Sequence, residues 1–390
     1  MSQKEAVMQY VDAHKEEMIA LWRDLVNTEG GTHEKEYVDV VAKKVCGIFT
    51  DLGFECQLHD LGPNNGMTLT GIWGADRPGK PILFSGHYDT VFKHGTFGSE
   101  PFHIEENGRA RGPGCLDMKG GIVITVFVLK ALMSLGYQER PIKILFCGDE
   151  EKGHVGAPTS DLIKEFAAGC LCAFNMETGL VSNDICVGRK GDFSFLITVH
   201  GVGAHSGNDF LKGRSAIHEM ARKILDLEKM TDLEKGTTVS ATLINGGTSR
   251  ASIAPECTID ADVRYELFSE LERIKSEITA MCAHNYIEGT TTEVKLVPQM
   301  AAFETTEPGL RLAQFISDIS QECGFGPMGT TRLGGGADSS YISQTGTPTV
   351  CSMGVRGEFN HTDREYALVD TLYERTKLLT MAVLRAANFS

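Results

Sequence analysis

Short apolar runs alternate with helix-like segments over the first half of the chain, and this alternation is the strongest constraint on its fold. The clearest examples, up to about Gly188, are residues 81–89, 120–137 and 141–151. Nearly continuous apolar strands separated by helices are typical of an α/β domain with a mainly parallel sheet. In such a sheet the reactive residues lie just beyond the carboxyl ends of the strands. We therefore expect a functional site where these runs end.

The hydrophobic pattern changes at about Arg189. Residues 189–297 contain, in order, one strand-like run, an amphipathic helix, two alternating strands, a second amphipathic helix and a last strand. This β-α-β-β-α-β order is the ferredoxin-like arrangement, an independent small module. After residue 297 the first pattern resumes, and 390 residues are too many for one ordinary core. The sequence predicts a mixed, mainly parallel α/β domain of residues 1–188 and 298–390, with a ferredoxin-like domain of residues 189–297 inserted into it.

Histidines and acids occur in a fixed order at or near the ends of apolar runs. They are His87, Asp117, the adjacent Glu150 and Glu151, Glu177 and His361. Two histidines and three carboxylates suit two Zn²⁺ ions that share one bridging carboxylate, and a further glutamate then remains for proton transfer. Asp89, two residues after His87, is placed to accept the second ring N–H of a metal-bound imidazole. The series is typical of a two-metal hydrolase.

Each of these residues also has a simpler interpretation when it is taken alone. His87 suits an ordinary surface or core position, and Asp117 suits the N-cap of the helix that follows it. Glu150 and Glu151 suit a solvated turn, and Glu177 and His361 are equally ambiguous. The three consecutive acids of residues 149–151 repel one another, however, and a metal would offset that repulsion. The joint order of all the residues favours the metal site.

Composition excludes several other classes of protein. The formal net charge is −15, and no basic stripe offsets it, which argues against a nucleic-acid partner. No apolar run approaches the ~20 residues needed to cross a membrane, and the charged N-terminal segment does not resemble a signal peptide. The eleven cysteines include no C-x-x-C pair and read as reduced thiols. We expect a cytoplasmic protein.

Eight motifs spread over nearly the whole chain carry a family resemblance. They are SGHYDTV, RGPGCLDMKGG, GDEEKG, METG, GVGAHSG, DADVR, GGGAD and FNHTDREY. These motifs resemble those of the di-zinc metallopeptidase family that includes glutamate carboxypeptidase, acetylornithine deacetylase, succinyl-diaminopimelate desuccinylase and aminoacylase. The resemblance implies a catalytic zinc domain, an inserted domain that serves as lid and dimerisation surface, and hydrolysis of an amide bond.

The resemblance also assigns roles to the metal-site residues. It implies that His87 and Glu177 bind one zinc ion, that Glu151 and His361 bind the other, and that Asp117 bridges both. Asp89 would orient His87. Glu150 would take a proton from the attacking water and later give it to the leaving amine. Two Zn²⁺ ions per subunit are expected, with Co²⁺ or Mn²⁺ as possible replacements.

Residues of the inserted domain are expected to act on the substrate. The resemblance implies that His205 reaches the active site of the partner subunit in a homodimer and stabilises the oxyanion, and that Arg264 grips a substrate carboxylate. Ser252 stands where many relatives have an asparagine, which puts family-typical binding at that position in doubt. Gly335 and Gly336 either present backbone N–H groups to the carboxylate or form a structural turn.

The expected activity is zinc-dependent hydrolysis of an amide bond in a small peptide or N-acyl amino acid that bears a free carboxylate. No G-x-S-x-G or H-E-x-x-H motif occurs, which disfavours a serine hydrolase and a thermolysin-type protease. The alternative within the enzymes is an N-acyl amino-acid deacetylase or desuccinylase. The alternative outside them is an inactive binding or scaffold relative.

Overall fold

The chain forms two compact units in a computed structural model that describes residues 2–298 and 300–389. The first unit comprises Met1–Gly188, Thr305–Leu333 and Ala337–Ser390, and the second comprises Arg189–Glu304 and Gly334–Gly336. The second unit extends past residue 297 because residues 300–304 remain attached to its first strand. Asp192 N–H donates to Met300 O, and Arg189 and Phe303 exchange two backbone hydrogen bonds.

The main sheet of the first unit has six strands. Their spatial order is β1 (Glu55–His59), β2 (Gly66–Trp73), β6 (Ile142–Gly148), β3 (Ile82–His87), β7 (Cys172–Asn175) and β17 (Thr349–Val350). The three pairings from β6 to β17 are parallel, and β1 and β2 are antiparallel to their neighbours. Every residue of β3 is buried, as its continuous apolar run predicts. The predicted mixed, mainly parallel sheet is confirmed.

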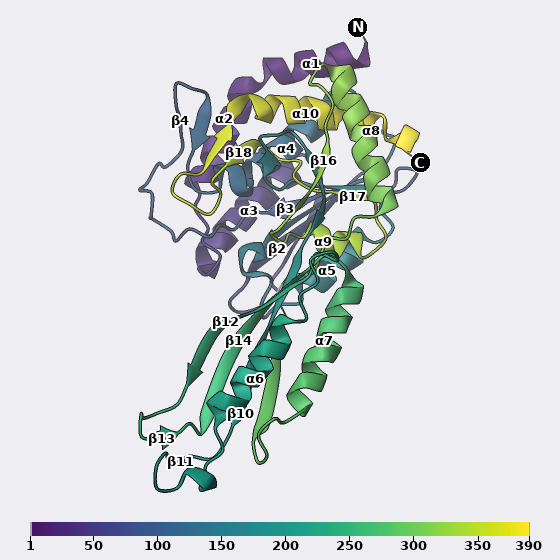
Figure 1. Cartoon of the computed structure of the whole chain (residues 1–390). Coiled ribbons are helices and arrows are strands. Elements are labelled where there is room, and N and C mark those ends of the chain that lie inside the picture. The colour runs from purple at the N-terminus through teal and green to yellow at the C-terminus, as the bar shows by residue number, and fades with distance from the viewer. Residues whose placement is uncertain (1, 299, 390) are drawn as a thin grey trace. The chain divides into compact units, whose positions relative to one another are not determined.

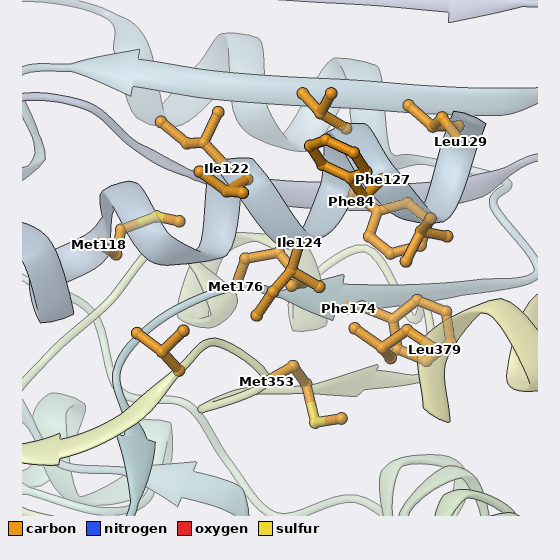
Figure 2. Close-up of a cluster of buried hydrophobic side chains, with 14 of the residues drawn as sticks. Phe84, Met118, Ile122, Ile124, Phe127, Leu129, Phe174, Met176, Met353 and Leu379 are labelled. Atoms are coloured by element: carbon orange, nitrogen blue, oxygen red, sulfur yellow. The ribbon is translucent and has the colours of Figure 1, made fainter. Parts of the chain in front are cut away.

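Helices surround this sheet and complete its core. They are α1 (Gln3–Ala13), α2 (Lys15–Asn27), α3 (Lys35–Asp51), α4 (Gly120–Ser134), α5 (Thr159–Ala167), α8 (Glu307–Cys323), α9 (Ser339–Ser343) and α10 (Val369–Leu384). Helix α4 is apolar on nearly all sides because it packs between the sheet and other helices, chiefly α10. Figure 2 shows Ile124 and Phe127 of α4 close to Phe84 of β3. None of the helices that the structure describes is long and apolar enough to span a membrane.

A second, smaller sheet in the first unit gathers segments that are far apart in sequence. Its order is β4 (His103–Ile104), β5 (Arg109–Arg111), β19 (Tyr366–Leu368), β18 (Arg356–Glu358) and β8 (Gly179–Leu180). Two further strands, β9 (Ile185–Arg189) and β16 (Thr330–Leu333), pair with each other. The smaller sheet therefore brings the chain after Glu177 beside the hairpin that carries His361.

The second unit has its own sheet and its own core. Strands β12 (Thr238–Gly246), β14 (Glu256–Tyr265), β10 (Gly191–His200) and β15 (Thr291–Pro298) form an antiparallel sheet in this spatial order. Helices α6 (Ala216–Glu228) and α7 (Phe268–Ala283) pack on this sheet and on each other (Figure 1). Buried and half-buried residues alternate along β14, as expected for a strand with one covered face. Elements β10, α6, β12, β14, α7 and β15 follow in β-α-β-β-α-β order, and a short ribbon of β11 (Ala204–His205) with β13 (Ser252–Ile253) is added to them.

Candidate metal centre

Four of the predicted residues lie at one edge of the main sheet. His87 is the last residue of β3, Glu150 and Glu151 begin the turn η2 (Glu150–Lys152) after β6, and Glu177 follows β7 by two residues. Strand β3 lies between β6 and β7, and the three strands are parallel. Their carboxyl ends therefore meet at the same edge, which is where open α/β sheets place their ligands.

The other two predicted residues reach this edge from the smaller sheet. Asp117 lies in the turn η1 (Cys115–Lys119), between β5 and α4, and the peptide bond that follows it is cis. His361 lies in the loop between β18 and β19 and has a left-handed backbone, with φ of 62°. The pairing of β19 with both β18 and β5 holds these two turns together. All six residues thus come to one place within the first unit.

The carboxylate of Asp117 lies between the two histidines. Its Oδ1 is 3.2 Å from His87 Nε2, and its Oδ2 is 3.1 Å from His361 Nε2. On one side, His87 Nε2 is 3.3 Å from Glu177 Oε1 and 4.0 Å from Glu150 Oε2. On the other side, His361 Nε2 is 3.1 Å from Glu151 Oε2. One carboxylate with a separate donor set at each oxygen is the arrangement of a bridging ligand between two metal ions.

The donor atoms of the cluster fit metal ions. His87, Glu150 and Glu177 form one group with the spacing of a metal site, and His87, Asp117 and Glu151 form another. Within residues 2–298 and 300–389, the buried Glu177 Oε1 accepts no hydrogen bond, because His87 Nε2 lies 3.3 Å away without hydrogen-bond geometry. A buried oxygen without a partner costs about 1–3 kcal/mol, or more when it is charged, and a cation would remove that cost. Imidazole and carboxylate ligands in this ratio suit Zn²⁺.

The electrostatics of the cluster also favour the binding of a cation. Burial raises the pKa of Glu150 well above its usual value, and Glu177 and Asp338 raise it further. Burial and Asp117 raise the pKa of Glu151 to about 7. Hydrogen bonds to Asp117 and Glu151 raise the pKa of His361 to about 11. Glu150 and Glu151 therefore ionise less readily than free glutamates, and a divalent cation beside them would favour their ionised forms.

Asp89 holds two parts of the cluster. His87 Nδ1 is 3.0 Å from the main-chain oxygen of Asp89 and 3.4 Å from its Oδ1. The Asp89 carboxylate also accepts the N–H of Glu150 at 3.3 Å and that of Glu151 at 3.1 Å. Asp89 therefore contacts the His87 ring mainly through its carbonyl, while its carboxylate holds the turn that carries both glutamates.

The sequence did not single out Glu365, which organises the segment around Asp117. Its buried carboxylate accepts the N–H groups of Leu116 at 2.8 Å and Asp117 at 3.2 Å. Burial, together with the charge of Asp117, raises the pKa of Glu365 to about 7. Asn360 adds a hydrogen bond to Asp117 Oδ2 at 3.0 Å. Asn360 and Glu365 lie within four positions of His361 in the sequence. Only this proximity could have indicated that they belong to the site.

A second buried ion cluster adjoins the turn that carries Glu150 and Glu151. His154 Nδ1 is 2.8 Å from Asp149 Oδ1, and its Nε2 is 2.6 Å from Asp338 Oδ1. All three residues are buried, and His154 has a left-handed backbone with φ of 58°. Burial alone would lower the pKa of His154, but Asp338 and Asp149 hold it well above its usual value. No sequence signal connects His154 to Asp338, because the two lie 184 positions apart.

The remaining predicted residues, His205, Ser252, Arg264, Gly335 and Gly336, all belong to the second unit. His205 and Ser252 are paired across β11 and β13. His205 is exposed, and its Nδ1 accepts the N–H groups of Gly207 at 3.2 Å and Asn208 at 3.1 Å. Because Nδ1 is an acceptor, the proton of the neutral ring is on Nε2, which then is free to act as a donor.

Arg264 and the glycine loop have partners inside the second unit. Arg264 Nε and Nη2 donate to the two carboxylate oxygens of Asp262 at 3.0 and 3.2 Å, and Nη1 is 3.6 Å from Asp192. Arg189 Nη1 donates to the carbonyls of Gly335 at 3.1 Å and Gly336 at 3.4 Å. A substrate carboxylate at Arg264 would have to compete with Asp262. The hydrogen bonds from Arg189 use the carbonyl oxygens of Gly335 and Gly336. They do not involve the N–H groups of these two glycines.

Comparisons with known proteins agree with this geometry. The model of peptidase family M20/M25/M40 matches residues 83–385. Carboxypeptidase G2 of Pseudomonas sp. (strain RS-16) is 28% identical over 366 residues, which cover 92% of this chain and 87% of that protein. The succinyl-diaminopimelate desuccinylase of Ralstonia pickettii (strain 12J) is 28% identical over 361 residues, with 85% and 89% covered.

Solved structures share the fold. The aminopeptidase PepT of Bacillus cereus ATCC 10987 superposes with a TM-score of 0.78 at 21% identity and covers 96% of this chain and 99% of its own. The YXEP protein of Bacillus subtilis, described as a dinuclear metal binding peptidase, superposes with a TM-score of 0.68 at 16% identity, with 96% and 99% covered.

Proposed function

The chain belongs to peptidase family M20/M25/M40, a family of hydrolases, and on that premise we propose that it cleaves an amide bond in a small peptide or N-acyl amino acid that carries a free carboxylate. The observation that carries the proposal is the carboxylate of Asp117, with one oxygen toward His87 and the other toward His361. Glu150, whose pKa is raised by desolvation, has its Oε2 4.0 Å from His87 Nε2.

The proposed metal ligands follow from this arrangement. His87 and Glu177 would hold one Zn²⁺, Glu151 and His361 would hold the other, and Asp117 would bridge the two; Co²⁺ or Mn²⁺ would suit the same donors. The absence of a hydrogen bond at Glu177 Oε1 and the placement of Asp117 between His87 and His361 support the assignment. When bound, such a pair of ions polarises a carbonyl and lowers the pKa of water from about 15.7 to about 7.

Glu150 is the proposed acid and base. It would take a proton from the attacking water and return it to the nitrogen of the leaving amine. A general base works best when its pKa lies near the operating pH, and burial moves the pKa of Glu150 in that direction. The hydrogen bond from Glu150 N–H to Asp89 fixes the turn that carries this carboxylate.

Residues of the second unit are proposed to recognise the substrate. Arg264 would exchange Asp262 for the free carboxylate of the substrate, and the N–H groups of Gly335 and Gly336, with the hydroxyl of Ser252, would add hydrogen bonds. His205 would donate from Nε2 to the oxyanion in the active site of a partner subunit. Its acceptor role at Nδ1 supports this assignment, since the donor is then Nε2.

We propose that the partner is a second copy of this chain, bound through the second unit. Strand β12 is an edge of its sheet, and Leu243 and Ile244 on that strand are 68% and 61% exposed. Leu225 of α6, which packs on β12, is 63% exposed. An exposed apolar edge strand is a template for pairing with another chain. The reduced, mostly buried cysteines support a cytoplasmic location.

Two alternatives concern the substrate and the activity itself. Similarity to succinyl-diaminopimelate desuccinylases favours an N-acyl amino-acid deacetylase or desuccinylase as the second candidate. An inactive scaffold relative is disfavoured, because Glu150 and the complete set of candidate ligands are present. The carboxypeptidase hypothesis is preferred because carboxypeptidase G2 combines 28% identity with 92% coverage of this chain, whereas a desuccinylase that covers 93% of the chain is 24% identical.

The test combines metal analysis with a substrate panel. Purified protein should contain about two zinc ions per chain. Dipeptides with varied C-terminal residues are compared with N-acetyl and N-succinyl amino acids. Turnover of the dipeptides supports a peptidase, and turnover of the acyl amino acids supports a deacylase. A folded, metal-loaded protein that turns over neither group would contradict the proposed function.

A further inference from the structure

A cavity of about 430 Å³ lies wholly within the first unit and is built from segments that carry candidate metal-site residues. Phe92 follows Asp89 by three positions, and Pro113 precedes Asp117 by four. Thr362 is the residue directly after His361. These segments line the cavity together with Phe97, Pro101 and Arg111. The volume falls within the ~300–1,000 Å³ that ligand pockets occupy.

The cavity shares a wall with the candidate metal centre. Glu365 lines the cavity, and the carboxylate of this same residue accepts the N–H groups of Leu116 and Asp117 at 2.8 and 3.2 Å. A group bound in the cavity would therefore lie one side chain away from the segment that carries Asp117.

Aromatic and apolar surfaces remain available for a ligand in this cavity. The rings of Phe92 and Phe97 are half-buried and meet edge to face, with centroids 5.0 Å apart. Pro101 and Pro113 add rigid apolar walls. Aromatic rings favour a further ring at their faces or edges beyond the simple burial of area.

The charged groups at the inner wall already have partners. Arg111 Nε donates to Glu105 at 2.9 Å, and Arg111 Nη1 donates to the carbonyl of Glu365 at 3.3 Å. The Glu365 carboxylate is bound by backbone N–H groups. The other charged residues of the lining, Glu100, His103, Asp363 and Arg364, are exposed at its rim. The interior of the cavity is therefore better suited to bind an apolar ring than to bind an ion.

We propose that this cavity binds the group on the carbonyl side of the scissile bond and that Phe92 and Phe97 select an aromatic acyl group or side chain there. The inference rests on the proposed function, in which residues of the second unit recognise the free carboxylate of the leaving group. The cavity is formed only by the first unit, and the acyl side is the part of the substrate that still lacks a binding surface.

A matched pair of substrates tests this inference. N-benzoyl and N-acetyl derivatives of one amino acid share the leaving group and differ only in the acyl group. Wild-type protein should hydrolyse the benzoyl derivative with a kcat/KM at least about tenfold higher. Phe97→Ala and Phe92→Ala should each lower kcat/KM for the benzoyl derivative about 10- to 100-fold, as expected for the loss of a buried phenyl contact, with the acetyl derivative changed less than about threefold.

Phe166→Ala is the matched control, because Phe166 is a half-buried phenylalanine of α5 outside the cavity. Equal losses for both substrates, or no benzoyl preference in the wild type, would overturn the inference. If neither derivative is hydrolysed, the proposed function fails by itself, and the cavity is tested by binding. Calorimetry on the Glu150→Gln variant should then show benzoyl amino acid bound about tenfold more weakly after Phe97→Ala; unchanged binding would overturn the inference.

Discussion

His154 combines a left-handed backbone with full burial between two carboxylates. A non-glycine residue in this region of φ costs of order 1 kcal/mol, so the surrounding contacts must compensate for it. The two short contacts to Asp149 and Asp338 provide that compensation. The same contacts neutralise acids directly behind Glu150 and Glu151.

We expect His154→Asn to lower the free energy of unfolding of the metal-free protein by about 3–5 kcal/mol, because it leaves buried carboxylates without their cation. Asparagine tolerates a left-handed backbone, so the loss reports the ion pairs rather than strain. Denaturant unfolding gives the value. Lys275→Ala, which removes an exposed pair with Glu272, is the control and should change stability by less than about 1 kcal/mol.

The difference in unfolding free energy between wild type and His154→Asn should depend on pH, and the direction of this dependence follows from the pKa of His154. Asp338 and Asp149 hold the pKa of His154 above its usual 6.5, despite burial, which lowers it. Below pH 6.5 the folded and unfolded chains are both protonated at this residue, and its stabilising contribution is complete. At higher pH the unfolded chain loses the proton first, so the contribution declines toward the folded pKa. The difference in unfolding free energy between wild type and His154→Asn should become smaller as the pH rises above about 6.5; a difference that grows contradicts this.

Glu150→Gln should keep the bound metal and lower kcat by about 10²- to 10⁴-fold, because glutamine cannot accept or return a proton. Steady-state kinetics and metal analysis of the same sample check both parts. Glu55→Gln, an exposed acid of β1, should leave both values unchanged. A Glu150→Gln enzyme with the wild-type rate would remove Glu150 from the mechanism.

At the scale of elements, the sequence was most informative where strands are long and apolar. Strands β3, β6 and β7 and the residues that follow them could be predicted because their runs are continuous and parallel strands share one carboxyl edge. Strands β5, β18 and β19 could not, since three residues carry no readable periodicity and each depends on a distant partner. The roles of Glu365 and of the His154 contacts went unpredicted for the same reason.

The hairpin of β18 and β19 depends on Glu365 for its attachment to the turn around Asp117. Glu365→Ala should weaken zinc affinity about 10- to 100-fold, the usual effect of removing a group that orients metal ligands. Competition with a coloured chelator measures the affinity, and circular dichroism verifies that the variant is folded. Glu374→Ala, which removes a partly exposed partner of Arg356, should leave the zinc affinity unchanged.

At the scale of the whole molecule, the proposed homodimer makes the exposed edge of the second unit testable. Leu243→Lys combined with Ile244→Lys should convert the dimer to a monomer, because like charges would face each other across the edge. Light scattering after gel filtration gives the mass. Activity should be lost as the dimer dissociates, while the metal content stays constant. Val40→Lys is the control, because Val40 is an exposed apolar residue on α3, away from this edge. An active, verified monomer would contradict the cross-subunit role of His205.

The interruption of the first unit by the second also sets an order of events on the ribosome. Asp117, Glu150, Glu151 and Glu177 are all synthesised before the insertion, and His361 is synthesised after it. At about 5–20 residues per second, translation of residues 189–304 delays the last candidate ligand by roughly 6 to 23 seconds. The second unit has a core of its own, and it has this interval in which to fold. A nascent chain that has not reached residue 361 lacks the last candidate ligand, so the proposed metal centre can be completed only after the second unit has been synthesised.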